Sequence, residues 1–381
     1  MAPRLLIVAP QARDLAAIER LGLRERYAID FAGDDLDAGA APDLDALART
    51  WEGRIDGVVG TKDRSALVTA LLAQRLGLPG PSPEAMLACQ LKDRSRQLQR
   101  RIVAEATPQA WPLRDGPPPF PPPFFVKPVV GRLSLGARRV DTLEELAALE
   151  APAYVHEYAE LAGVDADGFL AEELLHGDEV TVEGFVAGGT VTVVGVTDSV
   201  KYPGTNSFQR FEYPSALGPE RIAELRSVVE RLLPGLGFDG GFFNVELVVP
   251  ATGPAQVLEV NGRIASQFAP LVEAVEGRST YEALFALAAG AAPAWEPRPP
   301  NGVALSYALR VFEDALVEAV PAAEPGLELL VRPGRLLSEQ GVNDVASYRL
   351  AIFDVWGETR AAAVAAAEER AASLRFALAA P

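Results

Sequence analysis

Two glutamates in the second half of the chain stand in a pattern that could bind a divalent cation. They lie in two apolar segments, residues 242–249 and 256–260, which are joined by a turn with two prolines. If this turn closes a hairpin, a side-chain period of two places Glu246 opposite or beside Glu259, with Cβ atoms about 5 Å apart. Two carboxylates at that distance repel each other unless a cation lies between them, and Mg²⁺ binds one or two carboxylates together with substrate phosphates. Asn261, two residues further on, could supply a third oxygen.

The same pair also fits a simpler interpretation, in which both glutamates lie on the solvated face of a two-sided sheet. Against this, Arg263 follows the second strand at once, and the segments around both glutamates are otherwise strongly apolar. These surroundings weaken the interpretation as a solvated face, and both interpretations stay open.

A second candidate site begins where a strand at 124–126 ends in Lys127. A loop follows, bounded by Gly131 and Gly136 and containing Ser134. Glycines let backbone N–H groups approach phosphate oxygens, the Ser134 hydroxyl is a further donor, and Lys127 would carry charge toward an α- or β-phosphate. The loop lacks the spacing of a P-loop, and an ordinary turn after a strand is the alternative.

A third segment, residues 171–179, is acidic and apolar and leads into another strand. Backbone groups beside Leu174 and Leu175 could read the edge of an adenine ring. The Glu179 side chain could then reach the hydroxyls of a ribose. A polar turn before a strand is the alternative interpretation of this segment.

Length and charge limit the partners that such sites could serve. With 381 residues the chain is expected to form two or three domains. It has 35 Lys and Arg against 52 Asp and Glu, a net charge of −17. An acidic surface does not attract duplex DNA or an anionic membrane, so neither is expected as a partner.

Counts of reactive residues exclude several kinds of chemistry. The single cysteine, Cys89, allows no disulfide framework, and the two histidines, His156 and His176, have no partner at metal-ligand spacing. No apolar stretch approaches the roughly 20 residues that cross a bilayer, and the N-terminus lacks the form of a signal peptide. We therefore expect a cytoplasmic protein.

The order of the predicted elements indicates how these sites are positioned. The first ninety residues alternate strands with helices, which predicts a parallel, doubly wound sheet of the Rossmann type. The predicted strands are 5–9, 27–31 and 55–59, with helices at 14–21, 67–76 and from Ser82 onward. No G-x-G-x-x-G follows the first strand, so a dinucleotide site is not expected there.

The rest of the chain reads as a linker followed by antiparallel sheet. Residues 115–123 are rich in proline and predict a stiff extended spacer. Gly188 and Gly189 join two alternating segments into a predicted hairpin. Further elements are predicted as a helix at 219–233, strands at 304–311, 327–331 and 348–353, and an Ala-rich helix at 358–378.

Taken in their order, these pieces resemble the ATP-grasp superfamily. The resemblance covers roughly residues 1–300, and its last motif is the most specific. The matching motifs are Leu91-Lys92-Asp93, Val126-Lys127-Pro128, the loop from Gly131 to Gly136, Glu172-Glu173-Leu174-Leu175 with Gly177 and Glu179, Asn244-Val245-Glu246, and Leu258-Glu259-Val260-Asn261-Gly262-Arg263.

The resemblance implies an α/β (α+β) ATP-grasp fold with three parts. These are a Rossmann-like N-terminal domain at 1–90, a nucleotide-binding region at 91–300 with a lid at about 122–170, and an antiparallel C-terminal lobe at 301–381. ATP would lie between two lobes together with Mg²⁺, or Mn²⁺ in its place. The lid would close to exclude water, because an acyl phosphate left open to water hydrolyses.

The resemblance also implies a role for each site residue. Arg263 and Lys127 would be the catalytic residues, with Arg263 binding the acid's carboxylate or the anionic tetrahedral intermediate. The other roles fall on Lys92, Lys127, Ser134 and Gly136 for the phosphates, Glu172, Leu174 and Leu175 for adenine, Glu179 for ribose, and Glu246, Glu259 and Asn261 for the metal.

Within the superfamily, residues 207–217 and the C-terminal lobe are most similar to stand-alone carboxylate–amine ligases that join amino acids. This implies an amide formed through an acyl phosphate, with release of ADP and phosphate, from a small carboxylate and a small amine. Lys201 and Arg210 are candidate binders of a substrate carboxylate, a plain surface loop being the alternative. We expect a homodimer. The glycine loop departs from the family with Arg132 and Leu133, where small residues are common.

Two other functions stay open at this point. One is an ATP-grasp enzyme of the carboxylase or purine-pathway type, although 381 residues leave no room for an extended carboxylase C-terminal region. The other is a nucleotide-binding module without turnover, against which the intact Glu246, Glu259, Asn261 and Arg263 argue. The sequence does not name the acid or the amine, because specificity depends on pocket shape.

Overall fold

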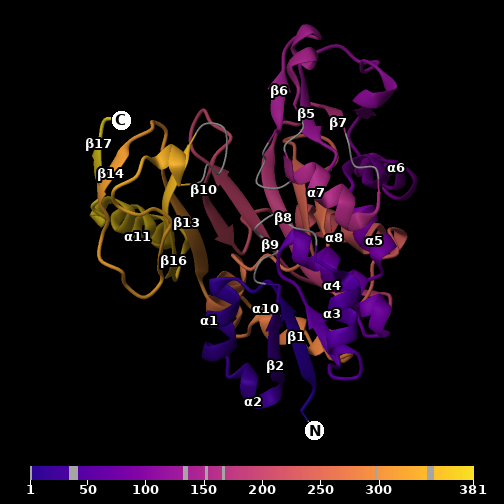
Figure 1. The fold of residues 1–381 in the computed structure, drawn as a ribbon. Helices are drawn as coiled ribbons and strands as arrows, with labels where there is room; N and C mark the ends of the chain where they lie inside the picture. Colours follow the sequence, from indigo (N-terminus) through magenta and orange to yellow (C-terminus); the bar gives the residue numbers. More distant parts are fainter. Residues whose placement is uncertain are drawn as a thin grey trace.

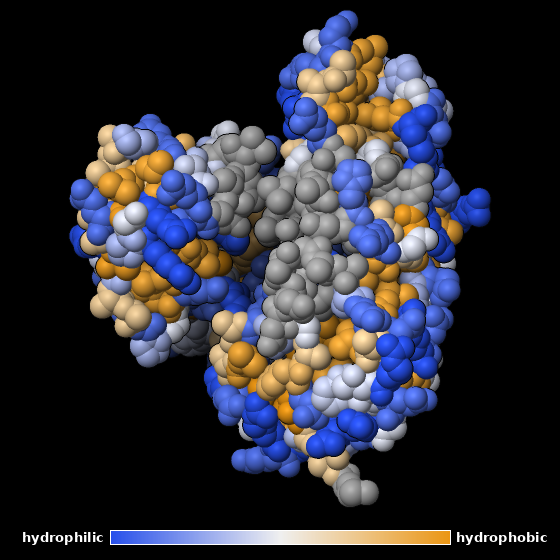
Figure 2. Space-filling model, viewed as in Figure 1, coloured by the Kyte–Doolittle hydropathy of each residue, from blue (hydrophilic) through white to orange (hydrophobic). Residues whose placement is uncertain are grey.

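The computed structural model describes residues 2–33, 42–131, 136–150, 153–164, 168–296, 298–340 and 347–381. Figure 1 shows an N-terminal domain at the bottom, a lid at the upper right and a C-terminal lobe at the left, around a long central sheet. In Figure 2 the surface is notched between the C-terminal lobe and the lid. None of the described helices is long and apolar enough to cross a membrane.

The N-terminal domain contains the predicted parallel sheet. Its strand order is β2-β1-β3, and both neighbours of the central strand run parallel to it. Each strand begins within two residues of its predicted start; the apolar runs of the first and third strands are buried, and that of the second is half-buried. The elements are β1 (Arg4–Val8), α1 (Ala12–Arg20), α2 (Leu23–Arg26), β2 (Ala28–Ala32), α3 (Leu44–Trp51), β3 (Gly57–Val59), α4 (Asp63–Leu76) and α5 (Pro83–Gln90).

A capped helix leads from this domain into the nucleotide region. Ser82 Oγ accepts a hydrogen bond of 3.2 Å from the Ala85 backbone N–H, and Pro83 is the first residue of α5, as predicted. The next helix, α6 (Lys92–Ile102), begins two residues after α5 ends. The backbone N–H of Lys92 donates to the carbonyl of Val129, at 2.9 Å, which fixes the start of α6 against the lid.

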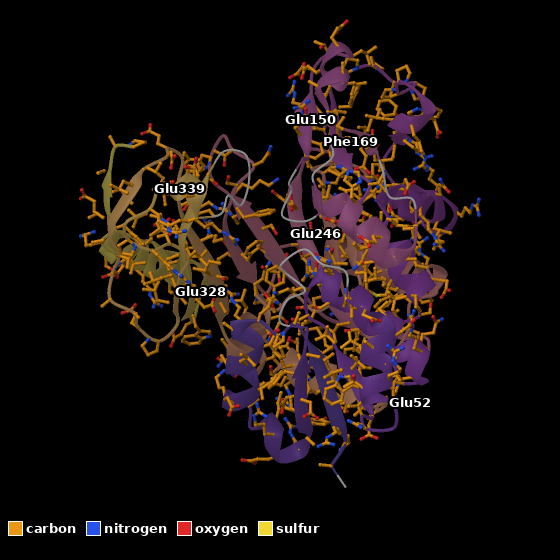
Figure 3. All side chains as sticks on the ribbon, viewed as in Figure 1. Glu52, Glu150, Phe169, Glu246, Glu328 and Glu339 are labelled. Carbon is orange, nitrogen blue, oxygen red and sulfur yellow. The ribbon has the colours of Figure 1, made fainter. Side chains whose placement is uncertain are left out.

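The lid is built on a small antiparallel sheet with its own apolar core. Its strand order is β4-β7-β5-β6, and its largest buried side chains are Phe124 and Phe169. Glu150 and Phe169 mark this region in Figure 3. The elements are β4 (Ala110–Pro112), β5 (Phe124–Pro128), β6 (Arg138–Val140), α7 (Ala153–Ala162) and β7 (Phe169–Glu173), with short 3₁₀ helices at Ala104–Ala106, Leu113–Asp115 and Glu144–Ala148.

The central sheet has eight antiparallel strands and carries the candidate site. Its order is β12-β11-β8-β9-β10-β13-β16-β15, so it runs from the nucleotide region into the C-terminal lobe, and the boundary expected near residue 300 falls within one sheet. The strands are β8 (Asp178–Ala187), β9 (Thr190–Lys201), β10 (Phe208–Tyr213), β11 (Gly241–Val249), β12 (Gln256–Asn261), β13 (Val303–Val311), β15 (Leu327–Leu329) and β16 (Tyr348–Gly357).

Helices cover both faces of this sheet. α8 (Pro219–Gly235) packs on β8 and β9, and α11 (Arg360–Ser373) packs on β13 and β16. Phe243, Val245 and Leu247 share one hydrophobic core with α8, as strand period two predicts. The opposite face contacts α9 (Ala269–Glu276), α10 (Thr280–Ala288) and the N-terminal domain. Asn244 and Glu246 lie on this opposite face.

The prediction for the C-terminus is wrong in part. The helix predicted over 358–378 ends at Ser373, and the last residues form β17 (Ala377–Ala379). This strand pairs with β14 (Leu316–Ala319), where Leu378 lies opposite the buried Val317. Burial of Leu378 against that strand outweighs the helix propensity of the alanines.

Candidate functional site

The predicted pairing of the two glutamates is confirmed. β11 and β12 are antiparallel neighbours, with Glu246 directly opposite Glu259 and Asn244 opposite Asn261. Figure 3 places Glu246 near the centre of the molecule, between the lid above and the N-terminal domain below. The hairpin thus presents both carboxylates on the face of the sheet that the lid overhangs.

The surroundings of Glu246 disfavour its charged form. Burial raises the pKa of Glu246, and the negative charges of Glu259 and Glu179 raise it further, while Arg263 and Lys92 lower it in part. A divalent cation between the carboxylates would remove this repulsion. The pair therefore has the electrostatics of a cation site.

Asn261 completes a donor set of oxygens. Its amide nitrogen donates to Glu246 Oε1 at 3.3 Å and to Asn244 Oδ1 at 3.4 Å, which leaves its amide oxygen as the atom that could bind a cation. No group of three or more Asp, Glu, His or Cys side chains in metal-binding arrangement occurs among the described residues. Two carboxylates and one amide oxygen fit Mg²⁺, which keeps waters and takes phosphate oxygens as its other ligands.

Both candidate phosphate-binding lysines reach this hairpin. Lys92, the first residue of α6, pairs with Glu259 through Nζ and Oε1 at 2.7 Å. Lys127, in β5 of the lid, pairs with Glu172 Oε2 at 2.7 Å and donates to the Leu258 carbonyl at 3.2 Å. Burial lowers the pKa of Lys127, and Glu172 offsets part of this effect. Two cations from different elements thus meet beside the carboxylate pair.

Sequence reasoning missed a third cation, Arg96. Its Nε lies 2.6 Å from Glu172 Oε1, and its Nη2 donates to the Leu258 carbonyl at 2.8 Å. Burial raises the pKa of Glu172, but Arg96 and Lys127 outweigh burial and lower it to about 2. The sequence spacing could have indicated this residue, since Arg96 lies four residues after Lys92 and so on the same side of α6. The Glu172 side chain is engaged in this buried triad.

The residues proposed for the nucleoside lie in the connection between β7 of the lid and β8 of the central sheet. Leu174 and Leu175 connect β7 to β8, and Gly177 follows with a φ of 152°. A Cβ on Gly177 would lie 2.3 Å from the Val249 carbonyl oxygen, so only glycine fits this close approach. Glu179 follows at the start of β8.

The glycine loop of the lid is described only at its ends. Gly136 has a φ of 75°, a left-handed conformation that glycine adopts without strain. Ser134 lies in residues 132–135, outside the described part of the chain. Its role toward phosphate stays a prediction.

The two candidate substrate cations lie on opposite faces of the sheet. Lys201, at the end of β9, pairs with Glu179 at 2.9 Å on the face that carries Glu246. Arg210 pairs with Glu212 at 2.7 Å and lies opposite Tyr307, on the face beneath α11. The site therefore gathers Lys201 but not Arg210.

Arg263 leaves β12 toward the N-terminal domain. Its guanidinium donates from Nε and from Nη2 to the two carboxylate oxygens of Asp63, the first residue of α4. Burial lowers the pKa of Arg263, but Asp63 outweighs burial and raises it. Sequence reasoning did not predict this partner.

Glu183 is a second carboxylate that the sequence analysis missed. It lies opposite Asn244 in β8 and is only 2 % exposed. Its Oε1 accepts a hydrogen bond of 2.7 Å from the Ala265 backbone N–H, and its Oε2 is buried without a hydrogen-bond partner among the described residues. Burial raises the pKa of Glu183 to about 8, which Ala265 and Arg263 oppose. Glu183 thus anchors the loop that carries Arg263.

The raised pKa of Glu183 predicts a loss of stability as the pH rises. An acid whose pKa is raised from 4.5 to about 8 on folding contributes stability that is complete below pH 4.5 and is lost as the pH rises through about 8. Glu183→Gln keeps an oxygen for Ala265 but does not titrate. Urea unfolding at about pH 5 and about pH 8 should show the wild type losing up to roughly 1.4 kcal/mol per pH unit relative to the variant. Parallel pH profiles of the two proteins would contradict this prediction.

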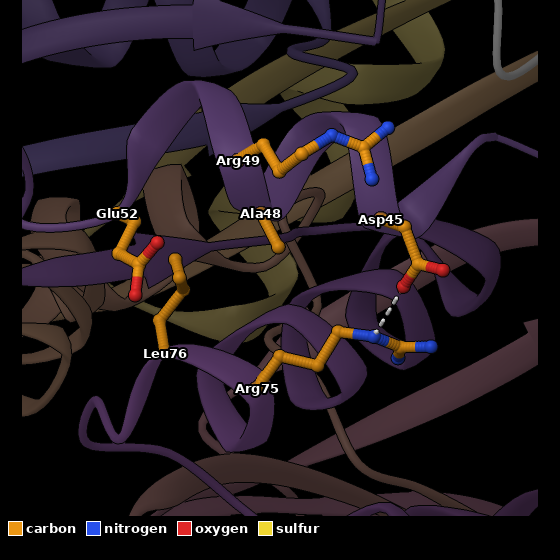
Figure 4. Close-up of a pocket in the computed structure, with 6 residues that line it drawn as sticks. All are labelled: Asp45, Ala48, Arg49, Glu52, Arg75 and Leu76. Atoms are coloured by element: carbon orange, nitrogen blue, oxygen red, sulfur yellow. Dashed lines mark hydrogen bonds and ion pairs between the residues drawn. The ribbon is translucent and has the colours of Figure 1, made fainter.

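A surface hollow of about 310 Å³ lies away from these residues, between α3 and α4 (Figure 4). Arg75 and Asp45 form an ion pair of 3.2 Å across it. None of the candidate site residues lines it; the lining residues are Asp45, Ala48, Arg49, Glu52, Arg75 and Leu76.

A small sheet lies over the antiparallel sheet, and Lys127 and Lys92 extend from it and from α6 toward the carboxylate hairpin. Residues 120–270 match the model of the ATP-grasp domain, and the predicted ATP-grasp fold is confirmed.

Comparison with solved structures extends this fold over the whole chain. The crystal structure of L-amino acid ligase from Bacillus licheniformis matches with a TM-score of 0.78 at 19 % identity, covering 98 % of each chain. Phosphoribosylglycinamide synthetase from Anaerococcus prevotii matches with a TM-score of 0.70 at 16 % identity, covering 99 % of this chain and 100 % of that chain. At these identities the similarity establishes the fold.

A curated relative has a higher sequence identity. Carnosine synthase 1 of Gallus gallus is 30 % identical over an alignment of 318 positions that covers 76 % of this chain and 33 % of that protein. The chain thus spans about a third of the length of this relative.

Proposed function

We propose that the protein is an ATP-dependent carboxylate–amine ligase that acts on small molecules, at least one of them an amino acid. The carboxylate of the acid attacks the γ-phosphate of ATP to form an acyl phosphate and release ADP. The amine then attacks the acyl carbon, and phosphate leaves as the amide forms. The observation that carries the proposal is the meeting of Lys92, Lys127, Glu246, Glu259 and Arg263 at one hairpin, which offers phosphate, metal and carboxylate ligands together.

The nucleotide and its metal occupy the lid side of this site in the proposal. Lys92 and Lys127 exchange part of their pairing with Glu259 and Glu172 for the phosphates of ATP. Glu246, Glu259 and Asn261 hold Mg²⁺, or Mn²⁺ in its place. When bound, the metal neutralises charge on the phosphate oxygens and orients the transferred group. Glu172 stays paired with Arg96.

The nucleoside and the second half of the reaction use neighbouring residues. Backbone groups at Leu174 and Leu175 bind adenine, and Glu179 binds the ribose. Arg263 binds the carboxylate of the acid and then the oxyanion that develops when the amine attacks. Lys201, on the same face, is the candidate for a further substrate carboxylate.

The amino-acid substrate is proposed on two comparisons. The solved structure with a TM-score of 0.78 is named as an L-amino acid ligase, and the curated relative at 30 % identity is named as a carnosine synthase. An enzyme of the purine-pathway or carboxylase type is the second candidate, favoured by the full-length similarity to phosphoribosylglycinamide synthetase.

Phosphate release from Mg·ATP across a pairwise panel of amino acids and small amines tests the proposal. We expect release that requires both an acid and an amine, with ADP rather than AMP as the other product. The dependence on both substrates follows because water is excluded from the acyl phosphate until the amine attacks. Release with bicarbonate or a purine precursor would instead establish the second candidate. Nucleotide binding without turnover on any pair would contradict both.

We also expect the protein to be a homodimer, since closed two-fold assemblies are the commonest oligomers of such chains. Light scattering at assay concentration measures this, and a monomer mass would contradict it.

A further inference from the structure

The pairing of Arg263 with Asp63 joins two parts of the chain that are 200 residues apart. Asp63 comes from the N-terminal domain, at the start of α4, whereas Arg263 follows the metal-site strand β12. Nε and Nη2 of Arg263 donate to the two oxygens of Asp63, and Nη1 donates to the Ile264 carbonyl at 3.3 Å. One edge of the guanidinium is therefore clamped.

A guanidinium has five N–H groups in a rigid planar fork. Three of them are used by Asp63 and Ile264, within the part of the chain that the structure describes. The two left over, one on Nη1 and one on Nη2, are those with which Arg263 could hold an oxyanion. Because the fork is rigid, the clamp at Asp63 decides the direction in which these two groups point.

Asp63 is in turn connected to the lid. Its backbone carbonyl accepts a hydrogen bond of 2.9 Å from Gln90 Nε2, and Gln90 Oε1 accepts from the hydroxyl of Tyr158. Gln90 is the last residue of α5, and Tyr158 belongs to the lid helix α7. Both are nearly buried, at 8 % and 7 % exposure, so solvent does not replace these bonds.

We propose that Asp63 is a positioning residue of the ligase reaction, which orients Arg263 toward the substrate oxyanion and ties that orientation to the lid through Gln90 and Tyr158. The inference rests on the proposed function. Its physical basis is that four groups from the N-terminal domain, the lid and the hairpin form one continuous chain of hydrogen bonds. With α7 packed in its observed position, Tyr158 and Gln90 fix the position of Asp63. Asp63 in turn fixes the direction of the two remaining N–H groups of Arg263.

Two contacts elsewhere in the molecule provide matched controls. Arg13 of α1 pairs with Glu328 of β15 at 2.8 Å, which is another ion pair between the N-terminal domain and a distant strand. Glu328 lies on the lower side of the C-terminal lobe in Figure 3, away from Glu246. Tyr281 donates to Asp14 at 2.6 Å, another buried tyrosine hydroxyl bound by a neighbouring element.

The experiment compares Asp63→Asn and Tyr158→Phe with Glu328→Gln and Tyr281→Phe. Two readouts are used: KM and kcat for the acid substrate and for ATP, and the affinity of inorganic phosphate for the Mg·ADP form measured by thermal shift. The second readout needs no turnover. If the wild type turns over no acid–amine pair, the proposed function fails while the phosphate measurement still tests Asp63.

Asp63→Asn should lower the affinity of the enzyme for the acid substrate and for inorganic phosphate by roughly 10- to 100-fold. The reason is that a charge-assisted hydrogen bond that orients Arg263 is lost. KM for ATP should stay within about twofold, since the lysines that bind it are untouched. Tyr158→Phe should act in the same direction by several-fold, and both controls should match the wild type.

Four results would overturn the inference. Asp63→Asn with unchanged phosphate and acid affinity would make the pair a passive contact. Tighter binding in that variant would make Asp63 a competitor for Arg263 rather than its orienting partner. If Tyr158→Phe binds both ligands like the wild type, the connection to the lid is excluded. If the wild type does not bind phosphate, the anion site at Arg263 is excluded.

Discussion

Replacing Glu259 with Gln should reduce ATP-dependent phosphate release by on the order of 10²- to 10³-fold. The change removes one of the two paired carboxylates and also the ion pair that holds Lys92 at 2.7 Å. A metal held by one carboxylate and a lysine that is no longer positioned would both misplace the phosphates. The measurement is the initial rate of phosphate release with a substrate pair identified in the panel.

Glu52→Gln is the matched control for this variant. Glu52 is an exposed glutamate at the end of α3 and lines the surface hollow of Figure 4. It should leave the rate within about twofold, as expected for a surface change away from the site. A Glu259→Gln enzyme with the rate of the wild type would exclude the hairpin as the metal site.

Replacing Glu172 with Ala should lower the free energy of unfolding by about 3–5 kcal/mol, the cost of breaking a buried ion pair. Glu172, Arg96 and Lys127 have side chains that are only 2 %, 4 % and 6 % exposed. Without the carboxylate, two cations are left buried and close together with no anion between them. Urea unfolding followed by tryptophan fluorescence measures the loss.

The exposed pair of Arg75 and Asp45 provides the comparison. Its side chains are 41 % and 70 % exposed, so solvent screens the charges. Asp45→Ala should therefore change the free energy of unfolding by less than about 1 kcal/mol. Equal stabilities of Glu172→Ala and Asp45→Ala would show that the buried triad contributes little to the fold.

Features that depend on nearby residues could be predicted from the sequence. Strand alternation and a short turn are sufficient to place Glu246 opposite or beside Glu259, and the structure shows that they are opposite. The same holds for the cap at Ser82 and for the N-terminal parallel strands. In these parts, residues that are close together in the sequence determine the geometry.

Contacts between distant segments could not be predicted in this way. Glu172 and Arg96 are 76 residues apart, and Asp63 and Arg263 are 200 apart. Local patterns carry no information about such pairs, because the packing of whole elements brings them together. Glu183 is a related case, since its strand alternates like a half-exposed one but the loop after β12 covers its polar face.

A β-bulge explains why Lys201 and Arg210 lie on opposite faces of the sheet. Lys201 pairs with Phe208, but the register shifts between Phe208 and Arg210, so that Arg210 pairs with Val200. One extra residue in a strand moves every later side chain to the other face. Without the bulge Arg210 would share the face of Lys201.

The continuous central sheet also limits how the chain can be divided. β10 and β13 are hydrogen-bonded neighbours, from Arg210 opposite Tyr307 to Tyr213 opposite Ala304. A chain shortened before β13 would expose the unpaired backbone of β10, and such an open edge recruits strands from other molecules and promotes aggregation. The C-terminal lobe thus covers the edge of β10, on the side of the sheet away from the glutamate hairpin, and a shortened chain would leave that edge open.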